Sequence, residues 1–430
     1  MSTPISIPDL HHAFLTCTGT STDTRSILSG SLFFALKGPN FNANAFAAEA
    51  LQKGARYAVV DDPIVAVDER FLLVPDVLKA LQGLACHHRR TFNIPVVAIT
   101  GTNGKTTTKE LVHAVLSADR PTLATSGNLN NHIGVPLTLL RMITDQRIAI
   151  IEMGANRPGD IAELMSIAEP THGLITNVGK AHLEGFGSFM GVIATKTELY
   201  AFIKANDGAL FVNADDTLLI DQSTGQKRIL YGRGAETDTS GDITGTGPFL
   251  EMAFAGRDQL AYQVATRLIG GYNLPNVLAA VAIGQHFGVP DQRIAEALTN
   301  YTPSNNRSQF TDTGRNQLVL DAYNANPTSM AAALENFAAM QSDRPKLVIV
   351  GDMLELGAES EKEHKAIVAL VDRLQLDARY VGKEFAKATD KAFNAASELI
   401  ERINADPIHG RFILVKGSRG IKLETVVPVL

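Results

Sequence analysis

The stretch from Val96 to Thr108 has the sequence VVAITGTNGKTTT. It begins with a short apolar run, which is typical of a buried parallel strand. Glycines and a polar pair follow, and the residues from Lys105 to about Ser117 favour a helix. A strand, a glycine-rich turn and a helix N-terminus in this order form an anion site, because backbone N–H groups point into the turn and the helix dipole adds positive potential there.

The same stretch places a lysine and a threonine at the start of the predicted helix. In a phosphate-binding loop of this type, the Lys105 ammonium reaches terminal phosphate oxygens and the Thr106 hydroxyl holds Mg²⁺. The general P-loop pattern has a glycine where this chain has Ile99, which leaves the shorter pattern Thr-Gly-Thr-Asn-Gly-Lys-Thr. An ordinary glycine turn with a solvated lysine is the alternative, and the order of strand, glycines, Lys-Thr and helix argues against it. The predicted nucleotide-binding residues of the loop are Gly101, Thr102, Asn103, Gly104, Lys105, Thr106 and Thr107.

The composition is that of a soluble globular protein. The chain has 430 residues, of which 45% are hydrophobic and 20% charged, which suggests two to four domains. The net charge of −6 gives no sign of a nucleic-acid partner. The two cysteines, Cys17 and Cys86, are far apart and form no Cys-x-x-Cys site, as expected in a reducing compartment. We interpret Cys86-His87-His88 as a helix face with surface histidines, since a second cluster of metal ligands is missing.

The sequence predicts neither a secretory signal at the N-terminus nor a transmembrane segment. The N-terminus has no basic region followed by an apolar core, so it is not a secretory signal. No apolar run reaches transmembrane length, so no membrane insertion is expected. We therefore expect a cytoplasmic protein.

The order of apolar runs predicts an α/β protein of three domains, over residues 1–93, 94–303 and 304–430. The first is a small α/β domain, with a strand expected at Ser31–Lys37 and a helix from Pro75 to about Arg90 that leads onward. The second carries the phosphate loop and alternates strand with helix, which predicts a mostly parallel sheet with helices on both faces. The third is another α/β region, with strands expected at 317–321, 346–350 and 411–415.

Polar residues follow several of the predicted strands, where ligands of such sheets bind. Glu152 comes at the end of the apolar run from Arg147, and His182 lies in the segment after the run 173–176. A carboxylate just past a buried strand suits Mg²⁺, which takes hard oxygen donors. The alternatives are that Glu152 caps a helix and that His182 is an ordinary loop residue. Both are less favoured, because the two residues are predicted at the same sheet edge as the phosphate loop.

The loop 126–136 is dense in side-chain amides. Amides suit neutral recognition of sugar, phosphate or peptide groups. A plain cluster of turn residues explains the same composition equally well, so the residues alone leave both interpretations open.

Taken together, these stretches resemble the Mur ligase superfamily, over nearly the whole chain from about Ser21 to about Leu423. Within that superfamily, the chain is similar to the members that add D-alanyl-D-alanine to UDP-N-acetylmuramoyl-tripeptide. The sister ligases that add diaminopimelate typically carry Asp-Asn-Pro-Arg, which this chain lacks. The segments that carry the resemblance are 100–106, 127–136, 152–156, 181–187, 323–329 and 416–419.

The resemblance implies roles for individual residues. Lys105 and Thr106 would hold phosphate and Mg²⁺, and Glu152 and His182 would be associated with metal. Lys196 matches the lysine that family members carbamylate, which would make it a ligand of a second Mg²⁺ and would require burial or neighbouring positive charge to keep its amine neutral. From the residues alone, a solvated lysine at a helix start is the favoured interpretation. Residues implied in nucleotide binding beyond the loop are Asn273 and Asn276 at the adenine, Arg307 at the phosphates and Asp321 near the ribose. Lys105, His182, Lys196 and Arg307 would together carry catalysis.

The resemblance also implies an activity. An ATP-dependent ligase would activate the carboxylate of UDP-N-acetylmuramoyl-tripeptide as an acyl phosphate and join it to D-alanyl-D-alanine in peptidoglycan precursor synthesis. Residues 1–93 would bind the uridine nucleotide, 94–303 ATP, and 304–430, in a Rossmann-like fold, the amine. We expect a monomer.

Two other functions remain open at this stage. The first is another ligase of the superfamily, which would add a single amino acid or extend folylpolyglutamate. The second is a nucleotide-dependent binding module without ligase activity. The joint presence of Glu152, His182, Lys196 and Arg307 argues against the binding module, because a switch has no need of a second metal site.

Overall fold

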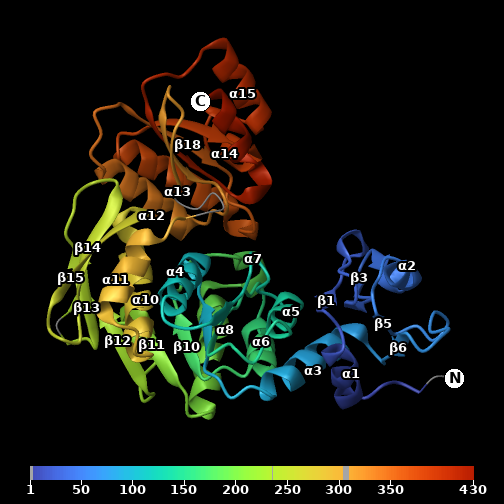
Figure 1. The fold of residues 1–430 in the computed structure, drawn as a ribbon. Coiled ribbons are helices and arrows are strands. Elements are labelled where there is room, and N and C mark those ends of the chain that lie inside the picture. The colour runs from blue at the N-terminus through green and yellow to red at the C-terminus, as the bar shows by residue number, and fades with distance from the viewer. Residues whose placement is uncertain (1–2, 235, 304–308) are drawn as a thin grey trace.

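The computed structural model describes residues 3–234, 236–303 and 309–430. Within these residues the chain forms three large sheets in succession along the sequence, each packed against helices, and one two-stranded sheet beside the first; Figure 1 shows the three regions in blue, in teal to yellow, and in orange to red. No described helix is both long and apolar enough to cross a membrane. The α/β class and the succession of three sheets confirm the predicted fold.

The first sheet has four parallel strands in the order β1-β2-β5-β6. The strand predicted at Ser31–Lys37 is shorter, because the chain leaves the sheet after Phe34 and turns into the small β3–β4 hairpin. The elements of this region are α1 (Ile7–Leu15), β1 (Thr20–Ser21), η1 (Thr24–Ser26), β2 (Leu32–Phe34), β3 (Lys37–Gly38), β4 (Phe41–Asn42), η2 (Ala43–Phe46), α2 (Ala47–Gln52), β5 (Tyr57–Val60) and β6 (Phe71–Leu73).

Helix α3 (Val77–Arg90) connects this region to the rest of the chain (Figure 1). The buried Arg89 guanidinium donates hydrogen bonds to four carbonyl groups, including that of Ala168 at the end of α6, and so fixes α3 to the central region. His88 is buried as well, between the His11 ring at 3.0 Å and the carbonyl oxygen of Met142 at 3.0 Å. The interpretation of His88 as a surface histidine is therefore wrong, because α1 covers that face of α3.

The second sheet has the order β15-β14-β13-β12-β11-β10-β7-β9-β8 and is parallel from β13 to β8. Alternate residues of β7 face opposite sides, so Val96 and Ala98 enter one core and Val97 and Ile99 another. Its elements are β7 (Val96–Thr100), α4 (Lys105–Ser117), β8 (Thr122–Ala124), α5 (Gly134–Leu139), β9 (Ile148–Glu152), α6 (Asp160–Ala168), β10 (His172–Ile175), α7 (Leu183–Phe186), α8 (Phe189–Ala205), β11 (Ala209–Asn213), α9 (Thr217–Gln222), β12 (Arg228–Gly232), β13 (Thr239–Ile243), β14 (Phe249–Ala255), β15 (Ala261–Ile269), η3 (Gly271–Asn273), α10 (Leu274–His286) and α11 (Asp291–Asn300).

One edge of this sheet differs from simple strand–helix alternation. Strands β13, β14 and β15 follow one another without a helix and pair antiparallel, as the yellow strands of Figure 1 show. Their apolar residues alternate, and Leu250, Met252 and Phe254 face the core that α10 covers. The strands are joined by short turns, which are sufficient for antiparallel pairing and insufficient for a parallel crossover.

The third sheet has the order β16-β17-β21-β18-β19-β20, and only β16 runs antiparallel to its neighbour among the described strands. The strands predicted near 317, 346 and 411 are β17, β18 and β21. The elements are β16 (Gln309–Asp312), β17 (Gln317–Asp321), α12 (Pro327–Ala339), β18 (Lys346–Gly351), η4 (Gly357–Glu359), α13 (Ser360–Arg373), β19 (Asp377–Val381), α14 (Lys383–Ala388), β20 (Ala392–Phe393), α15 (Ala396–Ala405), β21 (Phe412–Lys416), η5 (Arg419–Ile421) and η6 (Leu423–Val429).

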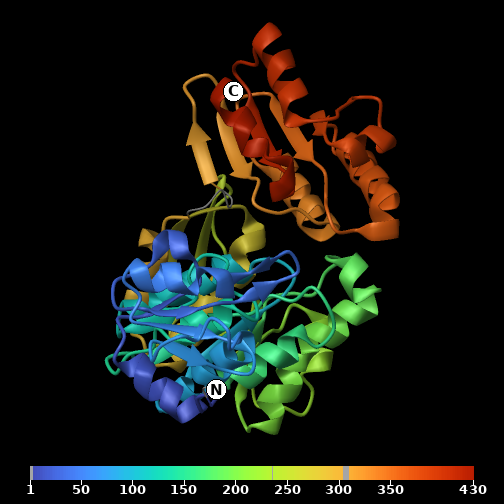
Figure 2. The ribbon, with the colours of Figure 1, turned by 90° about the vertical axis from the view of Figure 1, so that its right-hand side faces the viewer.

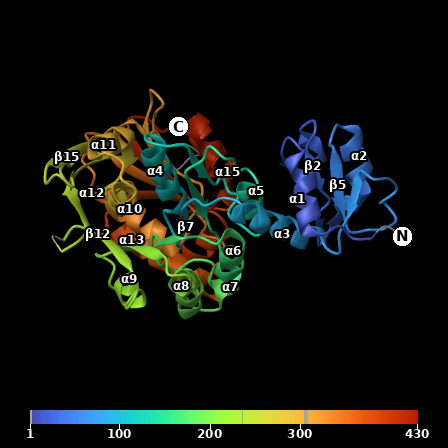
Figure 3. The same cartoon turned by 60° about the horizontal axis from the view of Figure 1, so that its bottom comes forward.

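The central and C-terminal regions lie directly against each other, and the N-terminal region lies to one side. Figure 2 shows the orange and red elements above the central region, and Figure 3 shows the N-terminal sheet held away from the rest on α3. The C-terminal region thereby covers the edge of the central sheet at which β7, β9 and β10 end. A site between these two regions is built from residues far apart in the sequence.

Candidate functional site

The phosphate-loop candidate connects β7 to α4, and two of its glycines are required by their surroundings. Gly101 has φ +146°, and a Cβ added there would lie 1.9 Å from Thr176 Oγ1. Gly104 has φ +78°, and a Cβ there would lie 2.7 Å from Asn276 Oδ1. A side chain at either position would clash or strain the backbone, so the glycines allow the loop to pass close to its neighbours.

The loop is held against the end of β10 by its own backbone. The N–H of Thr102 donates to the carbonyl of Asn177 at 3.0 Å, and the N–H of Asn103 donates to Asn177 Oδ1 at 3.0 Å. The first α4 bond runs from the N–H of Thr108 to the carbonyl of Gly104, at 2.8 Å. The N–H groups of the first turn of a helix have no intrahelical acceptor, so the turn from Lys105 to Thr107 presents amides to an anion.

The Lys105 ammonium lies over this loop. It donates to the carbonyl oxygens of Gly101 at 2.7 Å and of Thr102 at 3.0 Å. The side chain therefore curls back over the loop. Burial lowers the pKa of both His182 and Lys196, and the positive charge of Lys105 lowers both further.

Glu152 lies at the end of β9 beside the start of α4, almost fully buried. Its Oε1 accepts hydrogen bonds from Thr106 Oγ1 at 3.1 Å and from Asn130 Nδ2 at 2.8 Å. Its other oxygen, Oε2, is buried without a hydrogen-bond partner in the described part of the chain. A buried carboxylate oxygen without a partner is costly, and a cation would remove that cost. Glu152 caps no helix in the structure, so that alternative is wrong.

The donor set around Glu152 fits Mg²⁺ better than a metal held by protein alone. Among the described residues, no three His, Cys, Asp or Glu side chains converge as a metal cluster. Mg²⁺ is commonly bound through one or two carboxylates together with waters and substrate phosphates. The Thr106 hydroxyl and the Glu152 carboxylate, next to an anion-binding turn, are a set of this kind.

His182 lies across the site from Glu152, in the loop before α7, with φ +49°. Its Nδ1 contacts Glu355 Oε2 of the C-terminal region. Burial lowers the pKa of His182, the Glu355 carboxylate opposes this, and the charges of Lys105 and Lys196 lower the pKa further. The ring is therefore disposed to be neutral, which is the form of histidine that binds metals.

Lys196 is 2% exposed, in the middle of α8 rather than at a helix start, because the helix already begins at Phe189 with Ser188 as its N-cap. Its Nζ lies 5.8 Å from the centre of the Phe186 ring and forms no hydrogen bond or ion pair with any described residue. Burial holds the pKa of Lys196 well below its ordinary value, and the Lys105 charge lowers it further, against the attraction of Asp160 and Glu198. The solvated helix lysine considered from the sequence is excluded by this burial.

The predicted adenine and ribose residues lie at the other end of the loop. Asn276 Nδ2 donates to Asn273 Oδ1 at 2.9 Å, and Asn276 Oδ1 accepts from Thr108 Oγ1 at 3.1 Å. The Asp321 carboxylate, from the C-terminal region, is paired with the nearly buried Lys416 at 2.5 Å. The two asparagines are thus part of the wall beside α4, and Asp321 faces them from the other region.

A single cleft of about 1020 Å³ connects these groups. Of the predicted residues, those that line it are Thr102, Asn103, Gly104, Lys105, Thr106, Thr107, Glu152, His182, Asn273, Asn276 and Asp321. Gly101 and Lys196 are not among the residues that line it, and Arg307 lies outside the described residues. The central and C-terminal regions both contribute to the wall, so the cleft exists only where the two meet.

Several residues of the cleft received no role from sequence reasoning. Asn130 and Asn177 lie in polar loops that the sequence singles out, and they hold Glu152 and the phosphate loop. Asn130 thus orients Glu152, and recognition of sugar, phosphate or peptide groups by the loop 126–136 stays a prediction. Glu355 and Lys416 also line the cleft. In the sequence, each of them belongs to a polar cluster that follows an apolar strand, and such a cluster does not indicate which residues it will contact.

Comparison with known proteins finds relatives that match nearly the whole chain. The family descriptions Mur ligase middle domain and Mur ligase, glutamate ligase domain match residues 99–284 and 306–419. The UDP-N-acetylmuramoyl-tripeptide–D-alanyl-D-alanine ligase of Escherichia coli (strain K12) is 36% identical over 98% of this chain and 95% of its own length.

Two solved structures extend the comparison to the fold. MurF from Acinetobacter baumannii superposes with a TM-score of 0.87 at 31% identity, covering 99% of this chain and 98% of that one. MurF ligase from Thermotoga maritima, in complex with ADP, gives a TM-score of 0.85 at 26% identity, covering 97% of both chains. The chain therefore belongs to the Mur ligase family, in the group of UDP-N-acetylmuramoyl-tripeptide–D-alanyl-D-alanine ligases.

Proposed function

We propose that this chain is the ATP-dependent ligase that joins D-alanyl-D-alanine to UDP-N-acetylmuramoyl-tripeptide in peptidoglycan precursor synthesis. The observation that carries the proposal is the cleft between the central and C-terminal regions. There an anion-binding turn, Lys105 and a buried carboxylate with an unpartnered oxygen meet. Identity of 36% to a ligase of this name over nearly the full length supports the choice of substrates.

Each of the three domains binds a different substrate. Residues 1–93 bind the uridine nucleotide of the tripeptide substrate, 94–303 bind ATP, and 304–430 bring the amine and close on ATP. ATP occupies the phosphate loop, with its adenine toward Asn273 and Asn276 and its ribose toward Asp321. Arg307 reaches the phosphates from the C-terminal side, an assignment that rests on the sequence alone.

The reaction has two steps. A carboxylate oxygen of the tripeptide attacks the γ-phosphorus of ATP, the bond to the β,γ-bridging oxygen breaks, and ADP leaves an acyl phosphate behind. The neutral amine of D-alanyl-D-alanine then attacks the acyl carbon, loses a proton, and expels inorganic phosphate with the electrons of the broken C–O bond. Both steps bring negative oxygens together, so positive charge from Lys105 and the loop amides lowers the barrier where it develops. The rest of the rate comes from positioning.

Mg²⁺ would be held by Thr106 and Glu152, and a second ion by His182 and carbamylated Lys196. When bound, Mg²⁺ neutralises phosphate charge and orients the phosphoryl group. Within the described part of the chain, Glu152 Oε2 is buried and accepts no hydrogen bond, so this oxygen remains available to a cation. For Lys196, burial and the nearby Lys105 charge disfavour the ammonium, which is the condition for reaction of a neutral amine with CO₂.

Glu152→Gln tests the first metal site. The amide keeps the side-chain shape but removes the negative charge, so the Mg²⁺ concentration needed for half-maximal activity should rise about 10- to 100-fold or more. The same variant should melt at a temperature equal to or above that of the wild type, because a neutral amide is less costly to bury than a carboxylate. An unchanged Mg²⁺ requirement, measured by phosphate release across a Mg²⁺ titration, would exclude Glu152 as a ligand.

The choice of amine separates this ligase from its sisters. With UDP-N-acetylmuramoyl-tripeptide and ATP, D-alanyl-D-alanine should support phosphate release, and either substrate alone should not. A switch or binding module would hydrolyse ATP irrespective of the amine. If meso-diaminopimelate or lysine is used with a UDP-muramoyl-dipeptide and D-alanyl-D-alanine is not used with the tripeptide, the chain is a sister ligase instead.

A further inference from the structure

The phosphate loop and the C-terminal region are joined by a pair of side-chain amides. Asn326 Nδ2 donates to Asn103 Oδ1 at 2.7 Å, and Asn103 Nδ2 donates back to Asn326 Oδ1 at 3.4 Å. The two residues are 223 positions apart in the sequence. Asn326 is 5% exposed, so its amide group has lost water and depends on this partner.

Both sides of this pair are fixed by their own regions. The Asn103 backbone is bound on both sides by the two residues that follow β10, with its N–H donating to Asn177 Oδ1 and its carbonyl accepting from Thr176 Oγ1 at 2.6 Å. Asn326 is the N-cap of α12, and its Oδ1 also accepts from the N–H of Ser329 at 2.9 Å. Each asparagine is thus fixed within its own region, and the pair links the phosphate loop to the N-terminus of α12.

A second contact runs beside the first. Thr102 Oγ1 accepts from the N–H of Gly179 at 2.9 Å, and the next N–H, that of Lys180, donates to Thr328 Oγ1 at 3.2 Å. A Cβ at Gly179 would lie 2.8 Å from Thr328 Oγ1, so the backbones pass very close here. Lys180 Nζ also pairs with the buried Glu363 of α13 at 2.8 Å. Thr102 and Asn103 of the phosphate loop are thus both connected to the first turn of α12.

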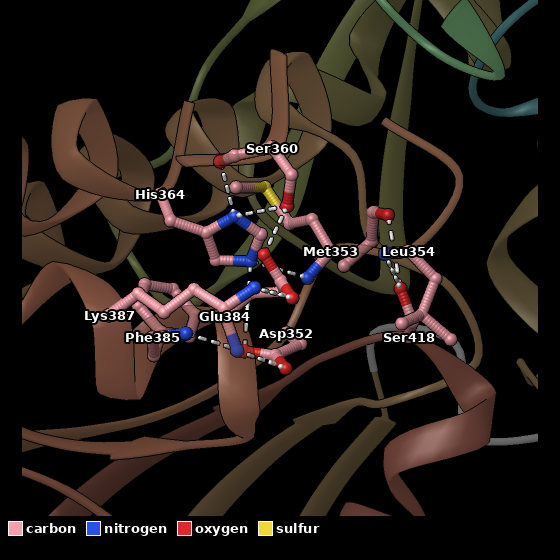
Figure 4. A network of polar contacts seen from close by, with 10 residues as sticks. Asp352, Met353, Leu354, Ser360, His364, Glu384, Phe385, Lys387 and Ser418 are labelled. Carbon is pink, nitrogen blue, oxygen red and sulfur yellow. Dashed lines mark hydrogen bonds and ion pairs between the residues drawn. The ribbon is translucent and has the colours of Figure 1, made fainter. Parts of the chain in front are cut away.

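Inside the C-terminal region, the segment before α12 is tied to the loop that carries Glu355. Ser418 Oγ donates to the carbonyl of Ala325 at 3.3 Å and accepts from the N–H of Leu354 at 3.0 Å. Figure 4 shows Ser418 beside Leu354, and on the other side the buried His364, whose Nε2 accepts from the N–H of Met353 at 3.1 Å. These contacts connect Ala325, the neighbour of Asn326, to Leu354, the neighbour of Glu355, whose carboxylate contacts His182.

We propose that Asn326 is a positioning residue, which through its amide pair with Asn103 docks the C-terminal region on the phosphate loop in the arrangement that completes the cleft. The proposal rests on the proposed function for its kinetic consequence: an acyl phosphate held at the loop must meet an amine that the C-terminal region brings. Without the pair, among the described residues only the contacts of Gly179 and Lys180 would hold α12 to the phosphate loop, so its position would be less well fixed and attack by the amine would slow.

Asn326→Ser is the decisive variant, because serine caps helices as well as asparagine does but is too short to reach Asn103. We expect kcat/KM for D-alanyl-D-alanine to fall about 10-fold, as expected for the loss of two hydrogen bonds, with an unchanged melting temperature. Asn103→Ala should give a similar fall. The double variant should be no worse than the worse of the two, since both remove one interaction. Asn394→Ser, the same change at an exposed position of the same region, is the control and should match the wild type.

Scattering gives a readout that does not depend on the amine. With a non-hydrolysable ATP analogue and Mg²⁺, small-angle X-ray scattering should give a larger radius of gyration for Asn326→Ser than for the wild type and Asn394→Ser. Multiplying effects in the double variant, or wild-type kinetics and radius for Asn326→Ser, would overturn the proposal. A wild type that releases no phosphate with D-alanyl-D-alanine would instead refute the proposed function, and the scattering comparison would still decide the role of Asn326.

Discussion

Lys196→Ala is expected to be nearly inactive and to recover part of its activity when short carboxylic acids are added. An ammonium cannot ligate a metal, whereas a carbamate formed from the neutral amine and CO₂ offers oxygen donors. Removing the side chain deletes those donors, and a small carboxylate diffusing into the same space replaces them. Phosphate release measured with and without added acetate or formate tests this directly, and stripping bicarbonate from the wild type should lower its activity.

The loss of activity must be separated from a loss of folding. Lys196 is nearly fully buried and forms no ion pair with the described residues, so its replacement by methionine, of similar length, should raise the melting temperature while activity is lost. Lys204→Ala, an exposed lysine on the same helix, should behave as the wild type in both measurements. Unchanged turnover of Lys196→Ala, or a high-resolution map with a free ammonium beside bound nucleotide and metal, would refute the carbamate.

Lys105→Ala should reduce kcat by a factor on the order of 10²–10³ or more and leave the fold intact. The lysine curls over the phosphate loop, and its charge is the nearest one that the described loop offers to a transferred phosphoryl group. The measurement is phosphate release under saturating substrates, accompanied by a thermal melt. A well-folded Lys105→Ala protein with near-normal kcat would show that the ATP site is assigned wrongly.

Local signals in the sequence were sufficient for the phosphate loop. The apolar run, the two glycines and the helix-favouring segment after Lys105 are contiguous, and the structure places α4 at the predicted Lys105–Ser117. The environment required for a reactive Lys196 was also predicted, from the chemistry of carbamates, and the side chain is in fact buried beside a positive charge. The phosphate loop could be predicted from a few contiguous residues, and the environment of Lys196 from the chemistry of the reaction.

The rest of the site depends on contacts between distant segments, which no local pattern encodes. Asn103 and Asn326, or Asp321 and Lys416, meet only because the C-terminal sheet lies over the end of the central one. The antiparallel strands β14 and β15 were missed for a related reason. Alternating apolar residues fit an antiparallel edge, but nothing in one strand states which neighbour it will pair with.

The central claim is that the carboxylate of the tripeptide attacks ATP and that the amine then displaces phosphate. The most direct test labels the terminal carboxylate of UDP-N-acetylmuramoyl-tripeptide with ¹⁸O, supplies ATP and D-alanyl-D-alanine in unlabelled water, and analyses the products by mass spectrometry. The account predicts one ¹⁸O atom in each inorganic phosphate released, in step with the D-alanyl-D-alanine adduct. Phosphate without ¹⁸O, or release of AMP and pyrophosphate, would contradict it.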